Sequence, residues 1–211
     1  MQCLAGRKDT QMESTSLDIR AFAFIISLAA VINGLGIVRW LTVLSEYLVQ
    51  KRKLDLQHYW VFSLLTVFQF LLHILMWWSM WAFRDATNVN FLTYLYLLAG
   101  PIILFLGTSA LIPNIETKRL DVQEHFSEVR PLYSTVLVLL WIWALFAGPV
   151  MRGALAPTAP LLVLFLGAAV LLRVTTSHKA HAVAVVFSWL VVVAFIAMFA
   201  MQLGGNAIQT G

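Results

Sequence analysis

The chain has 211 residues, of which 61% are hydrophobic and only 11% are charged. Soluble domains carry about 25% charged residues, so this chain has too few charges to cover a globule in water, and much of its surface must face lipid. The net charge of +4 does not indicate nucleic-acid binding, because the basic residues are scattered between hydrophobic stretches, as in membrane proteins whose loops lie beside an anionic leaflet.

Residues 1–18 form a polar N-terminal tail that we expect to be disordered. The tail holds the single cysteine, Cys3, which excludes an internal disulfide. It lacks the apolar stretch of a cleavable signal peptide, so we expect the first hydrophobic segment to direct insertion itself. Translation can start at Met1 or at Met12, and the sequence leaves this choice open.

Residues 19–203 contain six hydrophobic segments, which we interpret as a single transmembrane helical domain. A helix needs about 20 apolar residues to cross a bilayer core of about 30 Å. The apolar runs are continuous rather than alternating, which favours helices over a β-barrel. The expected spans are residues 21–49, 59–83, 90–113, 131–151, 157–173 and 180–203, followed by a C-terminal tail at 204–211. The sequence therefore predicts an all-α, polytopic transmembrane helical bundle of about six spans.

Residues 117–129, between the third and fourth spans, combine charged residues with apolar residues at roughly helical spacing. This pattern predicts a short amphipathic helix lying on the membrane surface.

Basic residues near the ends of the spans predict the orientation of the bundle. Most lie in the loops after spans one, three and five, namely Lys51, Arg52, Lys53, Lys118, Arg119, Arg130 and Lys179. The positive-inside rule places these loops in the cytoplasm and both termini outside.

Tryptophans mark both ends of the second span. Trp60 lies at one end, and Trp77, Trp78 and Trp81 lie at the other. Amphipathic indoles prefer the headgroup level of a membrane, so we interpret them as interfacial anchors rather than as a stacking site for a cofactor.

The second span also carries polar residues at depth. Thr66, Gln69, His73 and Trp77 recur at three- and four-residue steps and so share one helix face. Unpaired polar groups near mid-bilayer are costly and should face protein or water. Gln69 and His73 are therefore part of an interhelical hydrogen-bonding stripe, or part of a proton relay or polar translocation path. Haem ligation by His73 would need a second histidine at similar depth, and none is expected there.

The first span offers partners for this stripe. Asn33, Gly34 and Gly36 would let another helix approach closely. Arg39 and Glu46 fall on nearly the same face as Gly36 and could extend a polar path toward the cytoplasm. Alternatively, Arg39 marks the cytoplasmic end of the buried segment and extends its side chain outward to the interface.

Histidines and carboxylates gather on the expected cytoplasmic rim. His125 and Glu128 on the surface helix, with His178 and His181 at the start of the sixth span, are candidate ligands for Zn, Fe or Mn. Their spacing matches no specific metal signature, and solvated interfacial residues would look the same. We predict no cofactor.

The segments "GLGIVRWLTVLSEYL", "HYWVFSLLTVFQFLLHILMWWSMWAFR" and "LDVQEHFSEVRPLY" resemble a family of small bacterial multi-span inner-membrane proteins without an assigned activity. The resemblance covers the first two-thirds of the chain. It implies a location in the bacterial cytoplasmic (inner) membrane, and it carries no substrate, cofactor or catalytic residue.

Three function classes follow from these features. The first is a non-enzymatic, channel- or transporter-like bundle, able to assemble as a homo-oligomer, whose polar path is lined by Asn33, Gln69 and His73, with Arg39 and Glu46 toward the cytoplasm. The second is a membrane subunit or scaffold that docks a partner through residues 117–129. The third is a metal- or haem-dependent membrane enzyme, although no serine–histidine–acid order, phosphate-binding loop or cysteine cluster accompanies it.

Overall fold

The computed structural model of the chain describes residues 2–50, 59–81, 90–112 and 122–200. The elements in chain order are α1 (Gln2–Gln50), α2 (Trp60–Met80), α3 (Phe91–Leu111), α4 (Val122–Arg152), α5 (Ala159–Val174), α6 (His178–Phe195) and a short π-helix, η2 (Ile196–Ala200). Every element of the described residues is helical, which confirms the predicted all-α bundle.

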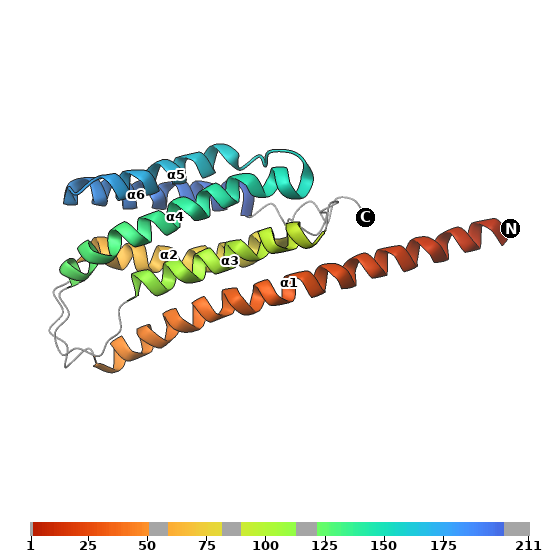
Figure 1. The fold of residues 1–211 in the computed structure, drawn as a ribbon, viewed down its shortest axis with the longest axis horizontal. Helices are drawn as coiled ribbons and strands as arrows, with labels where there is room; N and C mark the ends of the chain where they lie inside the picture. Colours follow the sequence, from red (N-terminus) through yellow and green to blue (C-terminus); the bar gives the residue numbers. More distant parts are fainter. Residues whose placement is uncertain (1, 51–58, 82–89, 113–121, 201–211) are drawn as a thin grey trace.

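Successive helices run in opposite directions, so the start of α1 and the end of α6 lie toward the same end of the bundle (Figure 1). The closest packing is between α3 and α4 and between α4 and α5, while α1 lies at the edge against α3 and α2. The N-terminal half of α1 extends past the other helices as a separate rod (Figure 1).

Among the described residues, five helical segments are long and apolar enough to cross a membrane: Ile26–Glu46, Trp60–Met80, Phe91–Leu111, Val122–Arg152 and His178–Phe199. The chain is therefore a multi-pass membrane protein. The remaining expected span is α5, whose 16 residues measure about 24 Å at ~1.5 Å per residue. This length is less than the bilayer core of about 30 Å.

The N-terminal tail differs from the prediction, because the described residues from Gln2 onward are helical and continuous with α1. Extending an existing helix costs far less than nucleating a new one, since each added residue gains one backbone hydrogen bond. No proline interrupts residues 2–50, so nothing in the sequence stops this extension. The structure thus gives residues 2–18 as helix, and the expectation of disorder at 1–18 stays a prediction.

The predicted surface helix is not a separate element in the structure. Residues 122–129 are the first turns of α4, which continues through Pro131 into the span. Phe126 is buried, and its ring centroid lies 5.6 Å from that of Tyr59 and 6.4 Å from that of Phe62. The apolar side of this segment thus packs on the bundle instead of on lipid, which holds it in line with α4. Residues 117–121 lie outside the described residues.

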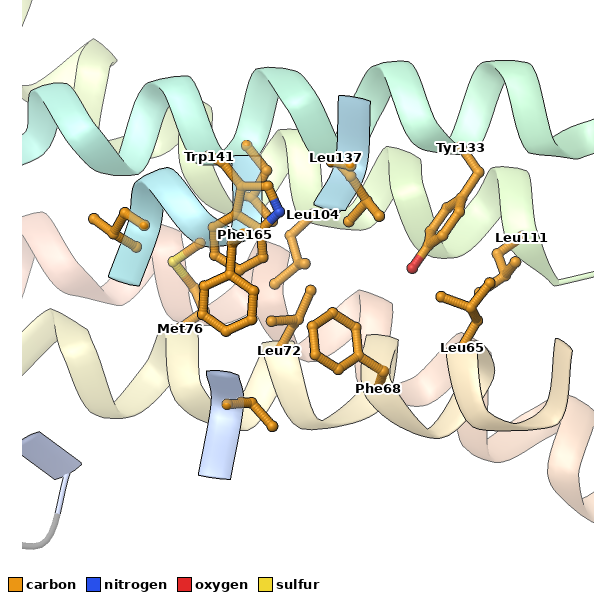
Figure 2. Close-up of a cluster of buried hydrophobic side chains, with 14 of the residues drawn as sticks. Leu65, Phe68, Leu72, Met76, Leu104, Leu111, Tyr133, Leu137, Trp141 and Phe165 are labelled. Atoms are coloured by element: carbon orange, nitrogen blue, oxygen red, sulfur yellow. The ribbon is translucent and has the colours of Figure 1, made fainter. Parts of the chain in front are cut away.

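The hydrophobic core lies between α2, α3, α4, α5 and α6 (Figure 2). At its centre Trp141 of α4 stacks on Phe165 of α5, with ring centroids 4.4 Å apart and planes 10° apart. By contrast, only 17% of the α1 window Ile26–Glu46 is buried, so most of α1 faces outward, as suits a lipid-exposed helix.

The tryptophans of α2 are exposed at both of its ends, as interfacial anchors require. Trp60, Trp77, Trp78 and Trp81 each leave about half of their surface uncovered. The basic loop residues 51–53, 118 and 119 and the predicted tail 204–211 lie outside the described residues.

Candidate functional site: a buried polar network beside a cavity

Five polar side chains from four helices meet inside the bundle. They are Asn33 of α1, Gln69 and His73 of α2, Thr108 of α3 and Tyr133 of α4, and each is at most 2% exposed. The structure therefore brings together Asn33, Gln69 and His73, as the sequence pattern indicated.

The hydrogen bonds of His73 place a proton on its Nδ1 atom. Asn33 Nδ2 donates to the His73 backbone carbonyl at 3.0 Å, which leaves Asn33 Oδ1 to accept from His73 Nδ1 at 2.8 Å. His73 Nε2 lies 2.7 Å from the Thr108 hydroxyl, which can donate to it or accept from it. His73 Nδ1 therefore carries a proton, and both ring nitrogens are engaged.

Gln69 joins three helices. Its Nε2 donates to the Leu104 carbonyl and to Thr108 Oγ1, both at 3.0 Å, and its Oε1 accepts from the Tyr133 hydroxyl at 3.0 Å. Figure 2 shows Tyr133 pointing from α4 into the interior. Among the described residues, no side-chain atom of these five is buried without a partner. The network is thus fully satisfied, which is what burial in a medium of low polarity demands.

Two glycines let the helices approach closely enough to form these bonds. A Cβ added at Gly36 of α1 would overlap the His73 imidazole, and one added at Gly107 of α3 would lie 3.2 Å from Gln69 Nε2. Gly34, expected to serve the same purpose, has no atom within 4 Å of its Cβ position. Of Gly34 and Gly36, therefore, it is Gly36 that makes the close approach.

Arg39 and Glu46 lie on α1 beyond the network. Arg39 is half-buried and about 9 Å along the helix from Asn33, at ~1.5 Å per residue. Glu46 is exposed and about 20 Å from Asn33 on the same measure. That separation is too large for Glu46 to share the site with His73.

The predicted metal ligands are dispersed. Within the described residues, no three His, Cys, Asp or Glu side chains are grouped to hold a metal ion. His125 Nε2 donates to the Leu111 carbonyl at 3.2 Å, Glu128 is exposed, and the rings of His178 and His181 have centroids 6.1 Å apart. Haem ligation by His73 would require breaking one of its two ring hydrogen bonds.

Arg130, near the beginning of α4, connects α4 to the end of α5 and the beginning of α6. Its Nη1 donates to the backbone carbonyls of Leu172, at 3.3 Å, and Thr175, and to His181 Nε2 at 3.0 Å. The guanidinium therefore satisfies carbonyls at the C-terminal end of α5, which lack intrahelical partners. This contact also aligns the end of α5 with the beginning of the α4 span.

A cavity of about 510 Å³ lies between the polar network and the end of α2 that carries Trp77, Trp78 and Trp81. Its inner end is formed in part by Leu72 and Leu104, which flank the network directly. Its walls are mainly apolar and come from all helices except α1, with Met76, Leu140, Trp141, Ala147, Leu162 and Phe165 among the lining side chains. Arg152, which is exposed, lies at its outer end.

The chain after α4 folds back over this cavity. Gly148 permits the fold, because a Cβ there would lie 2.7 Å from the Ala154 carbonyl oxygen. Gly153 has a φ of 70°, in the left-handed region that glycine adopts without strain. On the opposite wall Phe199, in the π-helical turn η2, also lines the cavity.

Sequence reasoning missed Thr108, Tyr133 and the cavity. Thr108 and Tyr133 are polar residues inside apolar spans, and that signal alone could have marked them. Their depth relative to Gln69 and His73 is visible only once the helices are aligned.

Comparison of the chain with protein-family models, with curated proteins and with solved structures found no match in any of the three. The geometry of the network and the cavity is therefore the basis on which a function can be argued.

Proposed function

We propose that this multi-pass membrane protein is a transporter-like bundle. In this proposal the cavity is the substrate site, open toward one end of the bundle, and the His73 network closes it toward the other end. One observation carries the proposal: the inner end of the 510 Å³ cavity rests on Leu72 and Leu104, the residues that border the network.

The properties of the network fit a closed gate at the inner end of the cavity better than a permanently open channel. The network is fully buried and each of its side chains has partners, so ions find no exposed polar groups there in this state. Its bonds join different helices, and such interhelical hydrogen bonds contribute only about 0.6 kcal/mol each on average. Thr108 Oγ1 also lies 3.2 Å from the Leu104 carbonyl, which gives its hydroxyl a second acceptor when the helices shift.

The proposal includes an orientation. Arg130, Arg173 and Lys179 lie at the end of the bundle opposite Arg152, near the junctions of α4, α5 and α6. The positive-inside rule supports placing that end in the cytoplasm of a bacterial inner membrane. The cavity then opens outward, and α5, which runs between the two ends of α4, makes a sixth crossing. Homo-oligomer formation and partner docking stay predictions.

Cysteine accessibility tests the proposal without knowledge of the substrate. In a Cys3→Ser background, single cysteines replace Ala147 in the cavity wall and the fully buried Ser134. Ser134 lies outside the cavity lining, and its hydroxyl bonds to the Arg130 carbonyl, one turn nearer the opposite end of the bundle. Leu139→Cys, at a position about half exposed to lipid, is the matched control. A membrane-impermeant thiol reagent is then added to one face of oriented proteoliposomes at a time.

We expect Ala147→Cys to react from the tryptophan-rich face, Ser134→Cys to react slowly from the opposite face, and Leu139→Cys to react from neither. Replacing Gln69 by Leu should speed the reaction of Ser134→Cys. If Ser134→Cys remains inert from both faces in every background, the network is a permanent structural contact and the transporter-like function is refuted.

A further inference from the structure

The cavity divides by chemistry into an apolar interior and a polar outer end. Leucine, methionine and aromatic side chains form its inner wall, including the stacked pair Trp141 and Phe165. The polar lining side chains Ser79, Thr158 and Arg152 belong to the ends of α2, α5 and α4. A ligand that satisfies both regions must have an apolar body and a polar head.

The charge at the outer end is positive. Arg152 is the one charged side chain that lines the cavity within the described part of the chain. It is exposed, and no hydrogen bond or ion pair among the described residues engages its guanidinium. A guanidinium presents a planar set of donors that matches carboxylate and phosphate groups, so the complementary head group is an anion.

The dimensions favour a slender ligand. Along α4 the lining extends from Leu140 to Arg152, about 18 Å at ~1.5 Å per residue. Dividing the volume of about 510 Å³ by this length gives a mean cross-section of about 30 Å². A cavity that is long and narrow in this way suits a ligand with a single hydrocarbon chain. The volume also lies within the range of about 300–1,000 Å³ that is typical of small-molecule sites.

We propose that the cavity binds a single-chain amphiphile with an anionic head group, with its chain between Leu72 and Phe165 and its head at Arg152. This inference rests on the proposed function, because it names the substrate class of the same cavity. The tryptophans near the outer end of α2 place the head at the level where amphiphiles present their polar groups in a membrane.

Photo-crosslinking in phosphatidylcholine nanodiscs tests the proposal. The probes are diazirine derivatives of hexadecanoate, hexadecyl phosphate and hexadecanol, which share a chain and differ in the head. Arg152→Gln removes the charge, and Arg173→Gln, an exposed arginine at the opposite end of the bundle, is the matched control. Ala147→Phe fills the cavity. Thermal unfolding of each variant shows that it is folded, and mass spectrometry locates the crosslinks.

We expect at least one anionic probe to label cavity residues more strongly than hexadecanol. Arg152→Gln should reduce that labelling about tenfold, because it removes a charge-assisted interaction, while Arg173→Gln leaves it unchanged. Ala147→Phe should abolish it. Stronger labelling by the carboxylate identifies fatty acids as the class, and stronger labelling by the phosphate identifies single-chain phospholipids.

Equal labelling by hexadecanol, or no effect of Arg152→Gln, overturns the anionic head group but leaves a binding cavity. Labelling that survives Ala147→Phe overturns amphiphile binding altogether. Neither result bears on access across the network, which cysteine labelling at positions 134 and 147 measures independently, so failure of this inference is distinguishable from failure of the proposed function.

Discussion

Replacing Gln69 by leucine should destabilise the bundle by about 2 kcal/mol. The substitution removes three interhelical hydrogen bonds, to Leu104, Thr108 and Tyr133, and such bonds in membrane proteins contribute about 0.6 kcal/mol each. It also leaves the Tyr133 hydroxyl, which is fully buried, without its acceptor. A buried donor left unpaired costs about 1–3 kcal/mol, so the estimate is a lower bound.

A double-mutant cycle measures the energetic cost of leaving the Tyr133 hydroxyl unpaired. Tyr133→Phe removes the hydroxyl that Gln69→Leu leaves unpaired, so the double variant should lose less stability than the two single variants together, by about 1 kcal/mol. The assay is reversible unfolding of purified protein in mixed micelles by increasing mole fraction of SDS. Thr66→Val is the control, since within the described part of the chain the Thr66 hydroxyl bonds only to the Phe62 carbonyl of its own helix.

Two results would refute this reasoning. The first is an additive cycle, which would mean that Tyr133 and Gln69 do not share a hydrogen bond in the folded protein. The second is a stability loss for Gln69→Leu no larger than that for Thr66→Val, which would mean that the network does not stabilise the bundle.

Three further predictions use the same measurements. Gly36→Ala should destabilise the bundle by at least about 2 kcal/mol, because its Cβ would overlap the buried His73 ring. Gly148→Ala should displace the chain that folds over the cavity, since its Cβ would lie 2.7 Å from the Ala154 carbonyl oxygen, and so should lower crosslinking in the cavity. Arg130→Gln should cost about 1–2 kcal/mol in unfolding free energy, because charged donors to the last carbonyls of α5 are lost.

Each of these predictions has a control within the chain. Gly34→Ala and Gly167→Ala place a methyl group where no atom lies within 4 Å, so neither should lower stability or crosslinking. Arg173→Gln removes an exposed arginine whose Nε donates to Thr135, and it should have little effect. Equal losses in a variant and in its control would contradict the structural explanation of that variant.

The sequence was sufficient to predict the class of fold and part of the site. Polar groups in lipid must turn toward protein, and this rule was enough to predict that Asn33, Gln69 and His73 lie together. The rule did not predict that Thr108 and Tyr133 lie at the same depth in the membrane as Gln69 and His73. That depth depends on how far neighbouring helices are shifted along one another, which is set by their packing. The cavity was beyond sequence reasoning for the same reason, since five helices and η2 contribute to its wall.

The differences between prediction and structure at two helix ends have a common origin. Residues 2–18 and 122–129 are polar or amphipathic, and both were predicted to be separate from the spans they precede. Helix propagation extends a span through any segment that lacks a break, and the burial of Phe126 adds tertiary packing that a hydrophobicity pattern does not reveal. Arg39 and Glu46 lie farther along α1 than Asn33, as their places in the sequence require, and their part in a polar path stays a prediction.

The proposed closure consists of hydrogen bonds, which has an energetic consequence for access to the far side of the network. Apolar packing between helices gains little from excluding lipid, whereas interhelical hydrogen bonds fix the register and each contributes little energy. Among the described residues, α4 joins the network through a single bond, from Tyr133 to Gln69. Losing about 0.6 kcal/mol there should raise the open population about threefold. Tyr133→Phe should therefore speed impermeant labelling of Ser134→Cys by at least about threefold, and an unchanged rate would show that α4 does not move away from α2 when the far side becomes accessible.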